Sequence, residues 1–400
     1  MELTSKASVI LVPGRESSVL RRHPWIFSGA VRNVQGNPSA GETVEIYSSA
    51  GQWLARGSYS PGSQIRIRIL TFDAGETVDE TFFENRISRA VELRQSLPGF
   101  REGNCARLIF SESDSLPGLI VDKYDDFLVC QFLSAGAEFW KDIITPKLQE
   151  IIPCRGIFER SDSDSRAKEG FAERTGLISG EEPPARVAVD DGKMKFWVDI
   201  RQGHKTGFYL DQRLNRLKIM DYANGREVLN AFSYTGGFGV AAAIAGASTV
   251  VNVDSSKDAL ELATENFRLN GLALEKSDFA EDDVFQLLRE YRDRRRQFDM
   301  IVLDPPKFVA SASQLDKGTR GYKDINLLAF KLLRPGGILV TFSCSGYVKP
   351  DLFAKIVSDA ALDAGRDAVI VENLHQSPDH PVALNFPEGL YLKGLICRVS

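Results

Sequence analysis

The sequence predicts a chain of the α/β class, with an all-β N-terminal domain, a small α+β middle domain and a C-terminal doubly wound parallel sheet. Three observations predict this architecture. Short strand-like runs fill residues 1–75, an amphipathic helical pattern opens residues 76–185, and strands alternate with helices over residues 186–400. At 400 residues the chain is also too long for one ordinary core, so several domains are expected.

The first 75 residues are strand-like runs separated by glycine and proline. Residues 64–70 contain a strict alternation that places Arg66 and Arg68 on one face and isoleucines on the other. Residues 1–72 hold eight Lys and Arg against four Glu, a local charge of +4 in a chain of net charge −5. A small basic barrel fits this pattern. Its charged face could bind phosphates or could be an ordinary solvated surface.

The middle segment mixes both kinds of secondary structure. Residues 80–97 are expected to form an amphipathic helix, with strands at 106–110, 118–122 and 127–133, a helix near 137–150 and a strand at 155–160. Residues 161–184 are charged and rich in Gly, Ser and Pro, which predicts a loop or linker.

In the last segment, strands are expected at 228–232, 249–254, 299–304 and 337–342, each of the later ones preceded by a helical stretch. Residues 258–270 read as a helix, with Ser255 and Ser256 as candidate N-caps. In such sheets ligands bind at the carboxyl ends of the strands.

Composition disfavours several other classes of protein. The five cysteines form no Cys-x-x-Cys pair and the four histidines are dispersed, so neither a metal site nor a disulfide framework is expected. No apolar run reaches the ~20 residues of a membrane span, and the N-terminus lacks the pattern of a signal peptide. A cytoplasmic location is therefore expected.

The turn after the first strand of the sheet carries a glycine cluster, Gly236-Gly237-Phe238-Gly239. Glycines let a backbone approach a ligand closely, although an ordinary tight turn would explain them as well. Asp254 ends the next strand, where a carboxylate can bind both hydroxyls of a ribose. Asp283 follows the third strand, where it could accept a hydrogen bond from an adenine amino group. A nicotinamide dehydrogenase would use similar features, but its glycine spacing is Gly-x-Gly-x-x-Gly.

Two further motifs end later strands of the sheet. Asp304 opens Asp-Pro-Pro-Lys-Phe308, in which the prolines stiffen the turn and Phe308 could stack on a flipped base. Cys344 stands in Phe-Ser-Cys-Ser at another strand end. A thiolate that adds to carbon 6 of cytosine makes carbon 5 nucleophilic enough to accept a methyl group, which is covalent catalysis by a thiol. Asp304 could orient or protonate the ring, and it is one candidate for the base that removes the carbon-5 proton.

The nearest alternative is methylation of a base nitrogen, such as one of guanine. Those enzymes also use Asp-Pro-Pro or Asn-Pro-Pro, but they need no thiol.

The motifs together resemble a bacterial family, the 23S rRNA (cytosine-5)-methyltransferases with an N-terminal PUA domain, also called the ribosomal RNA large subunit methyltransferase I family. The resemblance covers essentially the whole chain. The matching segments are residues 20–30, Gly203–Arg213, Leu229–Phe238, Asp304–Phe308, Arg320–Asn326 and Phe342–Ser345.

This resemblance implies a PUA barrel, an α+β middle domain and a Rossmann-like class I methyltransferase domain over residues 1–75, 76–185 and 186–400. It implies S-adenosylmethionine as methyl donor and 23S rRNA, or a precursor of the large ribosomal subunit, as substrate. Cys344 would be the nucleophile, with Asp304 as the second catalytic residue. The residues implied at the cofactor are Phe208, Ser233, Tyr234, Thr235, Gly236, Asp254, Asp283 and Asp304, and those expected at the RNA are Arg21, Arg22, Arg66, Arg68, Lys307 and Phe308.

One departure from the wider group of RNA cytosine-5 methyltransferases concerns product release. Many members carry a second cysteine directly after the Asp-Pro dipeptide, where this chain has Pro306. The base that completes the cycle is therefore open, as are the cytosine that is modified, the choice between naked rRNA and an assembled particle, and the formation of a homodimer. A non-catalytic RNA-binding protein built on a PUA domain is an alternative from another class, and it predicts no binding of S-adenosylmethionine.

Overall fold

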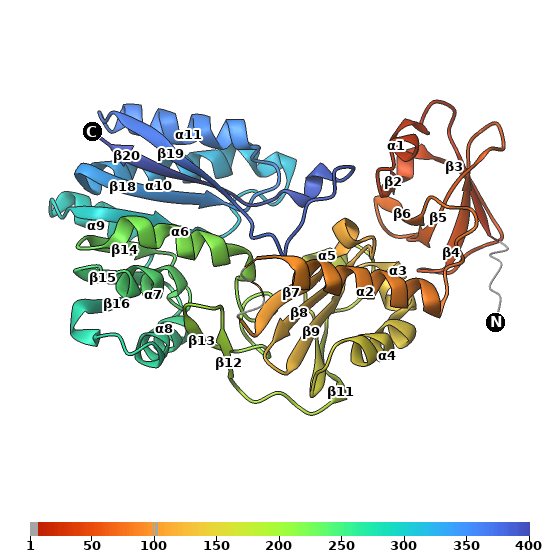
Figure 1. Cartoon of the computed structure of the whole chain (residues 1–400). Helices are drawn as coiled ribbons and strands as arrows, with labels where there is room; N and C mark the ends of the chain where they lie inside the picture. The colour runs from red at the N-terminus through yellow and green to blue at the C-terminus, as the bar shows by residue number, and fades with distance from the viewer. Residues whose placement is uncertain (1–6, 99, 101–102) are drawn as a thin grey trace. The chain divides into compact units, whose positions relative to one another are not determined.

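The structure is a computed structural model, and it describes residues 7–98, 100 and 103–400 (Figure 1). The chain divides into two compact units. The first comprises the described residues up to 192 together with residues 198–210 and 378–389, and the second comprises residues 193–197, 211–377 and 390–400. The chain therefore passes from one unit to the other five times. The predicted three-domain division, with boundaries near residues 75 and 185, stays a prediction.

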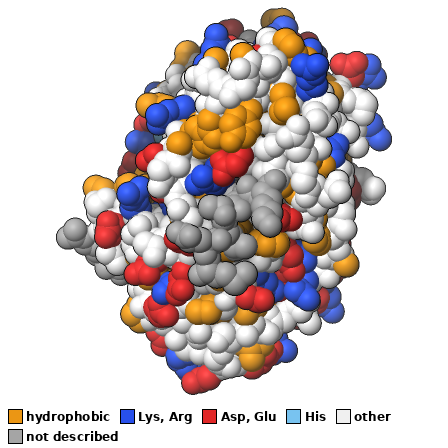
Figure 2. Space-filling view, turned by 90° about the vertical axis from the view of Figure 1, so that its right-hand side faces the viewer, with side chains coloured by type: hydrophobic (Ala, Val, Ile, Leu, Met, Phe, Trp, Pro, Cys, Tyr) orange, Lys and Arg blue, Asp and Glu red, His pale blue; other side chains and the backbone are white. Residues whose placement is uncertain are grey.

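The N-terminal part of the first unit is a six-stranded sheet of order β2-β6-β5-β4-β1-β3. Alternating side chains bury Val44 and Ile46 on β4 and Val9 and Leu11 on β1 in one apolar core. The elements are β1 Ser8–Leu11, α1 Ser17–Leu20, β2 Trp25–Phe27, β3 Val31–Gln35, β4 Thr43–Tyr47, β5 Trp53–Tyr59 and β6 Ile65–Thr71. On the face of the molecule in Figure 2, Lys and Arg side chains are interspersed with Asp and Glu.

The rest of the first unit is a five-stranded sheet of order β11-β10-β9-β8-β7, packed with helices. Helix α2 begins where Asp79 Oδ1 accepts a hydrogen bond from Phe82 N at 2.9 Å. The elements are α2 Glu80–Ser96, β7 Cys105–Phe110, β8 Leu119–Tyr124, β9 Phe127–Phe132, α3 Ala135–Phe139, α4 Lys141–Ile151, β10 Gly156–Ser161, α5 Asp164–Ala167 and β11 Arg174–Gly180.

The sequence predicted a loop or linker over residues 161–184, and this prediction is wrong. Strand β11 pairs antiparallel with β10, and a short helix precedes it. The strand lies at the edge of the sheet and is mostly solvent-exposed, so its sequence lacks the alternation of a half-buried strand. Composition alone therefore gave the wrong structure for this segment.

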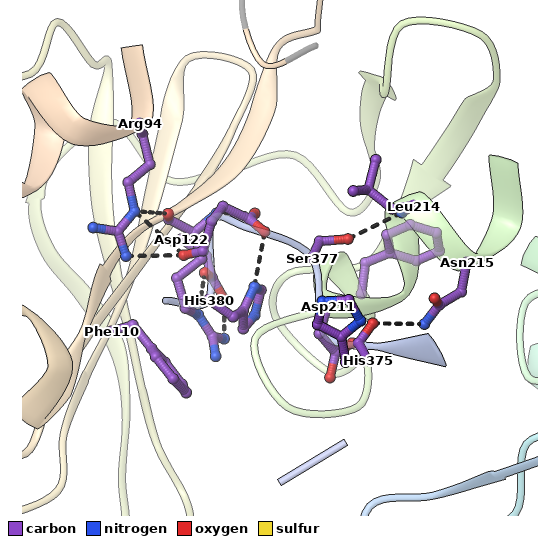
Figure 3. Close-up of polar contacts among 12 residues, drawn as sticks. Arg94, Phe110, Asp122, Asp211, Leu214, Asn215, His375, Ser377 and His380 are labelled. Atoms are coloured by element: carbon purple, nitrogen blue, oxygen red, sulfur yellow. Dashed lines mark hydrogen bonds and ion pairs between the residues drawn. The ribbon is translucent and has the colours of Figure 1, made fainter. Parts of the chain in front are cut away.

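Residues 378–389 return from the C-terminal part of the sequence to complete the first unit. Asp379 Oδ2 accepts a hydrogen bond from Arg107 N at 3.0 Å, and Arg94 donates to the carbonyl of Asp379 at 2.8 Å. His380 Nδ1 lies 2.9 Å from Asp379 Oδ1, and both side chains are buried (Figure 3). The ring of Phe386 also packs edge-on against Trp25 of the N-terminal sheet, with a centroid distance of 4.7 Å.

The second unit is built on a seven-stranded sheet of order β16-β15-β14-β17-β18-β20-β19. The first five strands are parallel, whereas β20 runs antiparallel to both of its neighbours. The strands are β14 Glu227–Ala231, β15 Thr249–Asp254, β16 Ser277–Glu281, β17 Phe298–Leu303, β18 Leu333–Ser343, β19 Ala368–His375 and β20 Lys393–Val399. The helices are α6 Arg213–Ala223, α7 Gly237–Ile244, α8 Lys257–Leu269, α9 Val284–Asp293, α10 Leu315–Leu332 and α11 Pro350–Asp363.

The predicted α/β class is thus confirmed. Two short strands, β12 Val187–Asp190 and β13 Lys195–Val198, precede the large sheet, and the sequence had not indicated them. The predicted cap of α8 is Ser256, whose Oγ accepts a hydrogen bond from Ala259 N at 3.2 Å. Within the described residues, no helix combines the length and the apolar character that crossing a bilayer requires.

Candidate active site

The carboxyl ends of the parallel strands align the predicted motifs at one edge of the large sheet. Ala231 on β14 is in register with Val253 on β15 and with Leu303 on β17, and Leu303 is in register with Thr341 on β18. Asp304 follows Leu303 directly, and Cys344 lies three residues past Thr341. With strands ~4.8 Å apart and a rise of ~3.3 Å per residue, this register puts the two Cα atoms on the order of 8 Å apart.

The turn from β14 into α7 is a tight, strained loop. Phe232, Tyr234 and Gly236 all have positive φ, at 59°, 45° and 79°. Such conformations are costly for residues other than glycine and persist where surrounding contacts enforce them. Asp254 supplies two of those contacts, because its Oδ2 accepts a hydrogen bond from Tyr234 N at 2.8 Å and its Oδ1 accepts one from Ser256 N at 3.0 Å.

Two hydroxyls in this turn are buried without a partner. Within the part of the chain that the structure describes, Ser233 Oγ and Thr235 Oγ1 have no hydrogen-bond partner, although both side chains are buried. Buried polar atoms are normally paired, so an unpaired pair in a strained glycine turn fits a site where a polar ligand completes the bonds. Gly239 at the first turn of α7 lies close to Asn252, since a Cβ there would be 2.1 Å from Asn252 Oδ1.

Asp304 is the most perturbed acid at this edge. Burial, and secondarily the nearby Asp211, raise the pKa of its carboxyl to about 7, while a hydrogen bond from Gln212 opposes the change. Gln212 Nε2 donates to Asp304 Oδ2 at 3.1 Å, and Gln212 Oε1 accepts from Asn215 Nδ2 at 2.6 Å. A carboxyl group with this pKa can hold or release a proton near neutral pH.

The Asp211–Asn215 segment is itself fixed by the end of β19. Asn215 Nδ2 donates to the carbonyl of His375, Ser377 N donates to the carbonyl of Asp211, and Leu214 N donates to Ser377 Oγ, at 3.1, 2.9 and 3.0 Å (Figure 3). The hydroxyl of Tyr391 also donates to Asp211 Oδ2. Gln212 is therefore held in place on the side away from Asp304.

The loop after Asp304 is anchored to the loop that carries Cys344. Ser345 Oγ accepts a hydrogen bond from Val309 N at 3.2 Å and lies 2.9 Å from the hydroxyl of Tyr322. The ring of Phe308 packs on Tyr322 with a centroid distance of 4.7 Å and also contacts Phe285. Phe308 is thus a partly buried anchor of the loop, and its predicted role as a surface for a flipped base stays a prediction.

Cys344 follows the last residue of β18 and is partly exposed. Cys105, Cys130 and Cys397 are buried, and burial raises the pKa of Cys397 to about 12 and that of Cys130 further still. The pKa of Cys154, which is partly exposed in the first unit, is also raised by burial. Cys344 is therefore the one thiol of the five that lies at the carboxyl edge of the sheet.

Two implied cofactor residues have contacts of another kind. Asp283 Oδ1 caps α9 by accepting from Gln286 N at 3.0 Å, which leaves its second oxygen for a ligand. Phe208 belongs to the first unit, where its side chain is buried and its backbone N–H and carbonyl both lie 3.3 Å from the hydroxyl of Tyr124.

The expected RNA contacts divide into exposed and buried residues. Arg21, Arg22 and Lys307 are exposed, and Arg66 is partly buried. Arg68 contradicts the prediction, because its side chain is buried and forms ion pairs with Glu112 at 3.3 Å and with Glu169 at 2.9 Å. It stabilises the interior of the first unit and is not available to a phosphate.

Five residues that support the site were missed from the sequence: Gln212, Tyr322, Ser345, Tyr391 and Lys393. Tyr322 lies in Arg320–Asn326, Gln212 in Gly203–Arg213 and Ser345 in Phe342–Ser345. The resemblance had therefore marked all three segments without assigning these residues a role. Lys393 opens β20, where no motif draws attention to it.

Comparisons with known proteins agree with this geometry. The family model for S-adenosylmethionine-dependent methyltransferases matches residues 172–396, and a model for PUA-like domains matches residues 9–72. "Ribosomal RNA large subunit methyltransferase I" of Aeromonas hydrophila is 57% identical over 393 residues, which cover 98% of this chain and 99% of that protein. The protein of the same name from Escherichia coli O139:H28 is 53% identical over 391 residues, with coverage of 98% and 99%.

Solved structures support the fold. A chain from Streptococcus mutans assigned to the SAM-dependent methyltransferases superposes with a TM-score of 0.85 at 22% identity and covers 98% of this chain and 99% of its own length. A second structure, solved in complex with SAH, gives the same TM-score at 21% identity and the same coverage. The predicted cofactor, S-adenosylmethionine, is confirmed by the family match. The chain belongs to the S-adenosylmethionine-dependent methyltransferases and, within them, to the ribosomal RNA large subunit methyltransferase I family.

Proposed function

We propose that this protein methylates carbon 5 of a cytosine in large-subunit ribosomal RNA, through a covalent adduct between the base and Cys344. The names of the relatives support ribosomal RNA of the large subunit as the substrate. The observation that carries the choice of carbon 5 is the position of Cys344, a partly exposed thiol directly after β18, on the same sheet edge as Asp304.

S-adenosylmethionine supplies an electrophilic methyl group on a sulfonium centre when it is bound. Asp254 would accept hydrogen bonds from the ribose hydroxyls with the lone pairs that its two backbone partners leave. The unpaired hydroxyls of Ser233 and Thr235, which lie in the strained turn, would bind polar groups of the cofactor. Asp283 would contribute the oxygen that does not cap α9.

The reaction requires a nucleophile because cytosine is unreactive at carbon 5. The Cys344 thiolate forms a bond to carbon 6, and the electrons of the 5,6 double bond then make carbon 5 nucleophilic. After carbon 5 has gained the methyl group, a base removes its proton. The carbon–hydrogen electrons restore the double bond, and the carbon–sulfur bond breaks to release the thiolate.

Asp304 would donate a hydrogen bond or accept a proton in this cycle, depending on its protonation state. Its pKa of about 7 means that the carboxyl is protonated in a large fraction of molecules at neutral pH, so that it can donate a hydrogen bond to the ring. In its ionised form the same group is a candidate for the base. The absence of a cysteine at Pro306 leaves room for this assignment.

The RNA would be bound where cations outnumber the acids that line the same surface. One cavity, of about 780 Å³ in the first unit, is lined by Arg22, Arg86 and Arg89, but Asp73, Glu76 and Glu112 balance their charge. Another cavity, of about 360 Å³ in the second unit, is lined by Arg292, Arg295, Arg296 and Lys331. Arg292 and Arg296 pair with Asp293 at 2.8 Å and Glu227 at 3.6 Å, but neither acid lines the cavity, so its lining is cationic. We therefore add this second cavity to Arg21, Arg22, Arg66 and Lys307 as a proposed contact for the phosphate backbone.

The test is methylation of 23S rRNA with labelled cofactor, followed by nucleoside analysis, for the wild type and for Cys344→Ala. We expect 5-methylcytidine from the wild type and none from Cys344→Ala, with Cys154→Ala as a matched control of unchanged activity. Full activity of Cys344→Ala, or a methylated guanine as product, would refute the proposal in favour of base-nitrogen methylation. Failure to bind S-adenosylmethionine in calorimetry would instead support a non-catalytic RNA-binding protein.

A further inference from the structure

Lys393 is a buried cation beside the proposed nucleophile. It is the first residue of β20 and is in register with Ser343, the residue before Cys344. Only 8% of the residue is exposed. Its Nζ donates to the carbonyl of Ser345 at 2.6 Å and to that of Val348 at 2.7 Å, so it bridges the turn that follows the cysteine.

A buried ammonium normally pairs with a carboxylate, because burial of an isolated charge is costly. Within the described chain, Lys393 forms no ion pair with an acidic side chain, and its two acceptors are neutral carbonyls. An ammonium has three N–H donors, and these carbonyls use two of them. Burial lowers the pKa of Lys393 to about 8, whereas the electrostatic influence of Cys344 raises it.

The other charged groups that act on Lys393 do not stabilise its charge. Lys349 and Lys307 both lower the pKa of its ammonium. Tyr322, which packs on the same turn through Ser345, has a pKa that burial raises, so its hydroxyl stays neutral. The thiolate of Cys344 is therefore the counter-charge that this arrangement can offer to Lys393.

We propose that Lys393 is a positioning residue for the reaction, which fixes the turn after Cys344 through two carbonyls and stabilises the thiolate with its charge. This inference rests on the proposed role of Cys344 as nucleophile. A cation next to a thiol favours the thiolate and therefore increases its reactivity at neutral pH. The position of β20 between β18 and β19 in the sheet is what brings a residue from the C-terminus to this place.

A structural role alone makes a different prediction. If Lys393 only bridges the turn, then a neutral side chain that donates to the same carbonyls should serve equally well. Lys393→Gln keeps amide N–H donors but loses the charge, whereas Lys393→Arg keeps the charge and the donors. Lys349→Met removes an exposed lysine from the same turn region and is the matched control.

The experiment measures the rate of alkylation of Cys344 by iodoacetamide in the full chain without RNA, as a function of pH, with the modified cysteine identified by peptide mass spectrometry. We expect Lys393→Gln to shift the midpoint upward by about one pH unit, which is about a tenfold lower rate at pH 7. Lys393→Arg and Lys349→Met should stay within about threefold of the wild type. Thermal unfolding of each variant checks that the fold is retained.

An unchanged profile in Lys393→Gln, or the same upward shift in Lys393→Arg, would overturn the proposal. If Lys393→Gln fails to fold, the pH profile of Cys344 alkylation in Lys393→Arg is compared with that in the wild type. A loss of thiol reactivity in Lys393→Arg, in which the charge is retained, would contradict the inference. Since alkylation requires no substrate, its outcome is independent of the product that the methylation assay identifies.

Discussion

Replacement of Arg68 by methionine should destabilise the protein strongly. The side chain of Arg68 lies between two buried carboxylates, Glu112 and Glu169, whose side chains are 8% and 2% exposed. Methionine replaces the apolar stem of arginine but has no charged end, so the substitution removes the ion pairs while it keeps the packing of the stem. It leaves two buried acids without their cation, and removal of one partner from a buried pair costs about 3–5 kcal/mol.

The remaining contacts place the expected loss near the lower end of that range. Glu112 Oε1 still accepts a hydrogen bond from Trp25 Nε1 at 2.7 Å. Glu169 Oε2 still accepts from Ser60 Oγ at 2.8 Å and from Ala135 N at 3.3 Å. With these donors retained, we expect a decrease of about 3 kcal/mol in the free energy of unfolding.

The assay is urea unfolding followed by circular dichroism, with the stability change read from the midpoint at a constant slope. Arg66→Met is the control on the same strand, because Arg66 is more exposed and donates a hydrogen bond to the neutral carbonyl of Pro61. A loss below about 0.5 kcal/mol in Arg68→Met, the size of an ordinary surface substitution, would refute the reasoning. A smaller effect of Arg68→Met in a Glu169→Gln background would support it, since one of the unpaired charges is then already absent.

Three other predictions concern the second unit. The pKa of Asp304 is about 7, whereas the ordinary value is 3.8, so the folded state binds the carboxyl proton more tightly than the unfolded state does. The stability that this proton contributes is complete below pH 3.8 and is lost as the pH rises to 7. Asp304→Asn should therefore gain thermal stability relative to the wild type between pH 5 and pH 8, by at most about 4 kcal/mol, and a difference in melting temperature that does not change with pH would contradict this. Gly239→Ala should lower the melting temperature and weaken cofactor binding in calorimetry, because the added methyl group overlaps Asn252, whereas Gly29→Ala, with open space around it, should change neither. Arg295→Ala/Lys331→Ala should reduce the salt dependence of rRNA binding by a slope of about two, and an equal reduction in the charge-matched control Arg268→Ala/Lys276→Ala would argue against a specific site.

The sequence predicted those parts of the fold whose signal is local. The strands at 228–232, 249–254 and 299–304 are apolar runs that need no distant partner to be recognised, and the structure has strands there. Their shared register then brings Asp254, Asp304 and Cys344 to one edge, as the alternation of strands and helices implied. Strand β11 was missed because an exposed edge strand buries no apolar face, so its sequence lacks the alternation of apolar and polar residues.

Features that depend on contacts between distant segments could not be predicted in this way. The alternation of β6 gave Arg66 and Arg68 the same face, but the acids that bury Arg68 lie 44 and 101 residues further along the chain. Lys393 reaches the loop of Cys344 because β20 lies between β18 and β19 in the sheet. The order of strands in a sheet cannot be inferred from the sequence of a single strand. The side chains that carry the chemistry were thus easier to find than those that hold them in place.

The five passages of the chain between the two units affect how the protein is made. Residues 378–389 complete the first unit, yet they are synthesised long after the rest of that unit. Until then Arg94 lacks the carbonyl of Asp379, and Trp25 lacks the ring of Phe386. At ~5–20 residues per second, the N-terminal segments of a newly made chain wait for tens of seconds before their native neighbours exist. Most of the first unit is therefore translated early, yet its fold can be completed only after residue 389 has been synthesised.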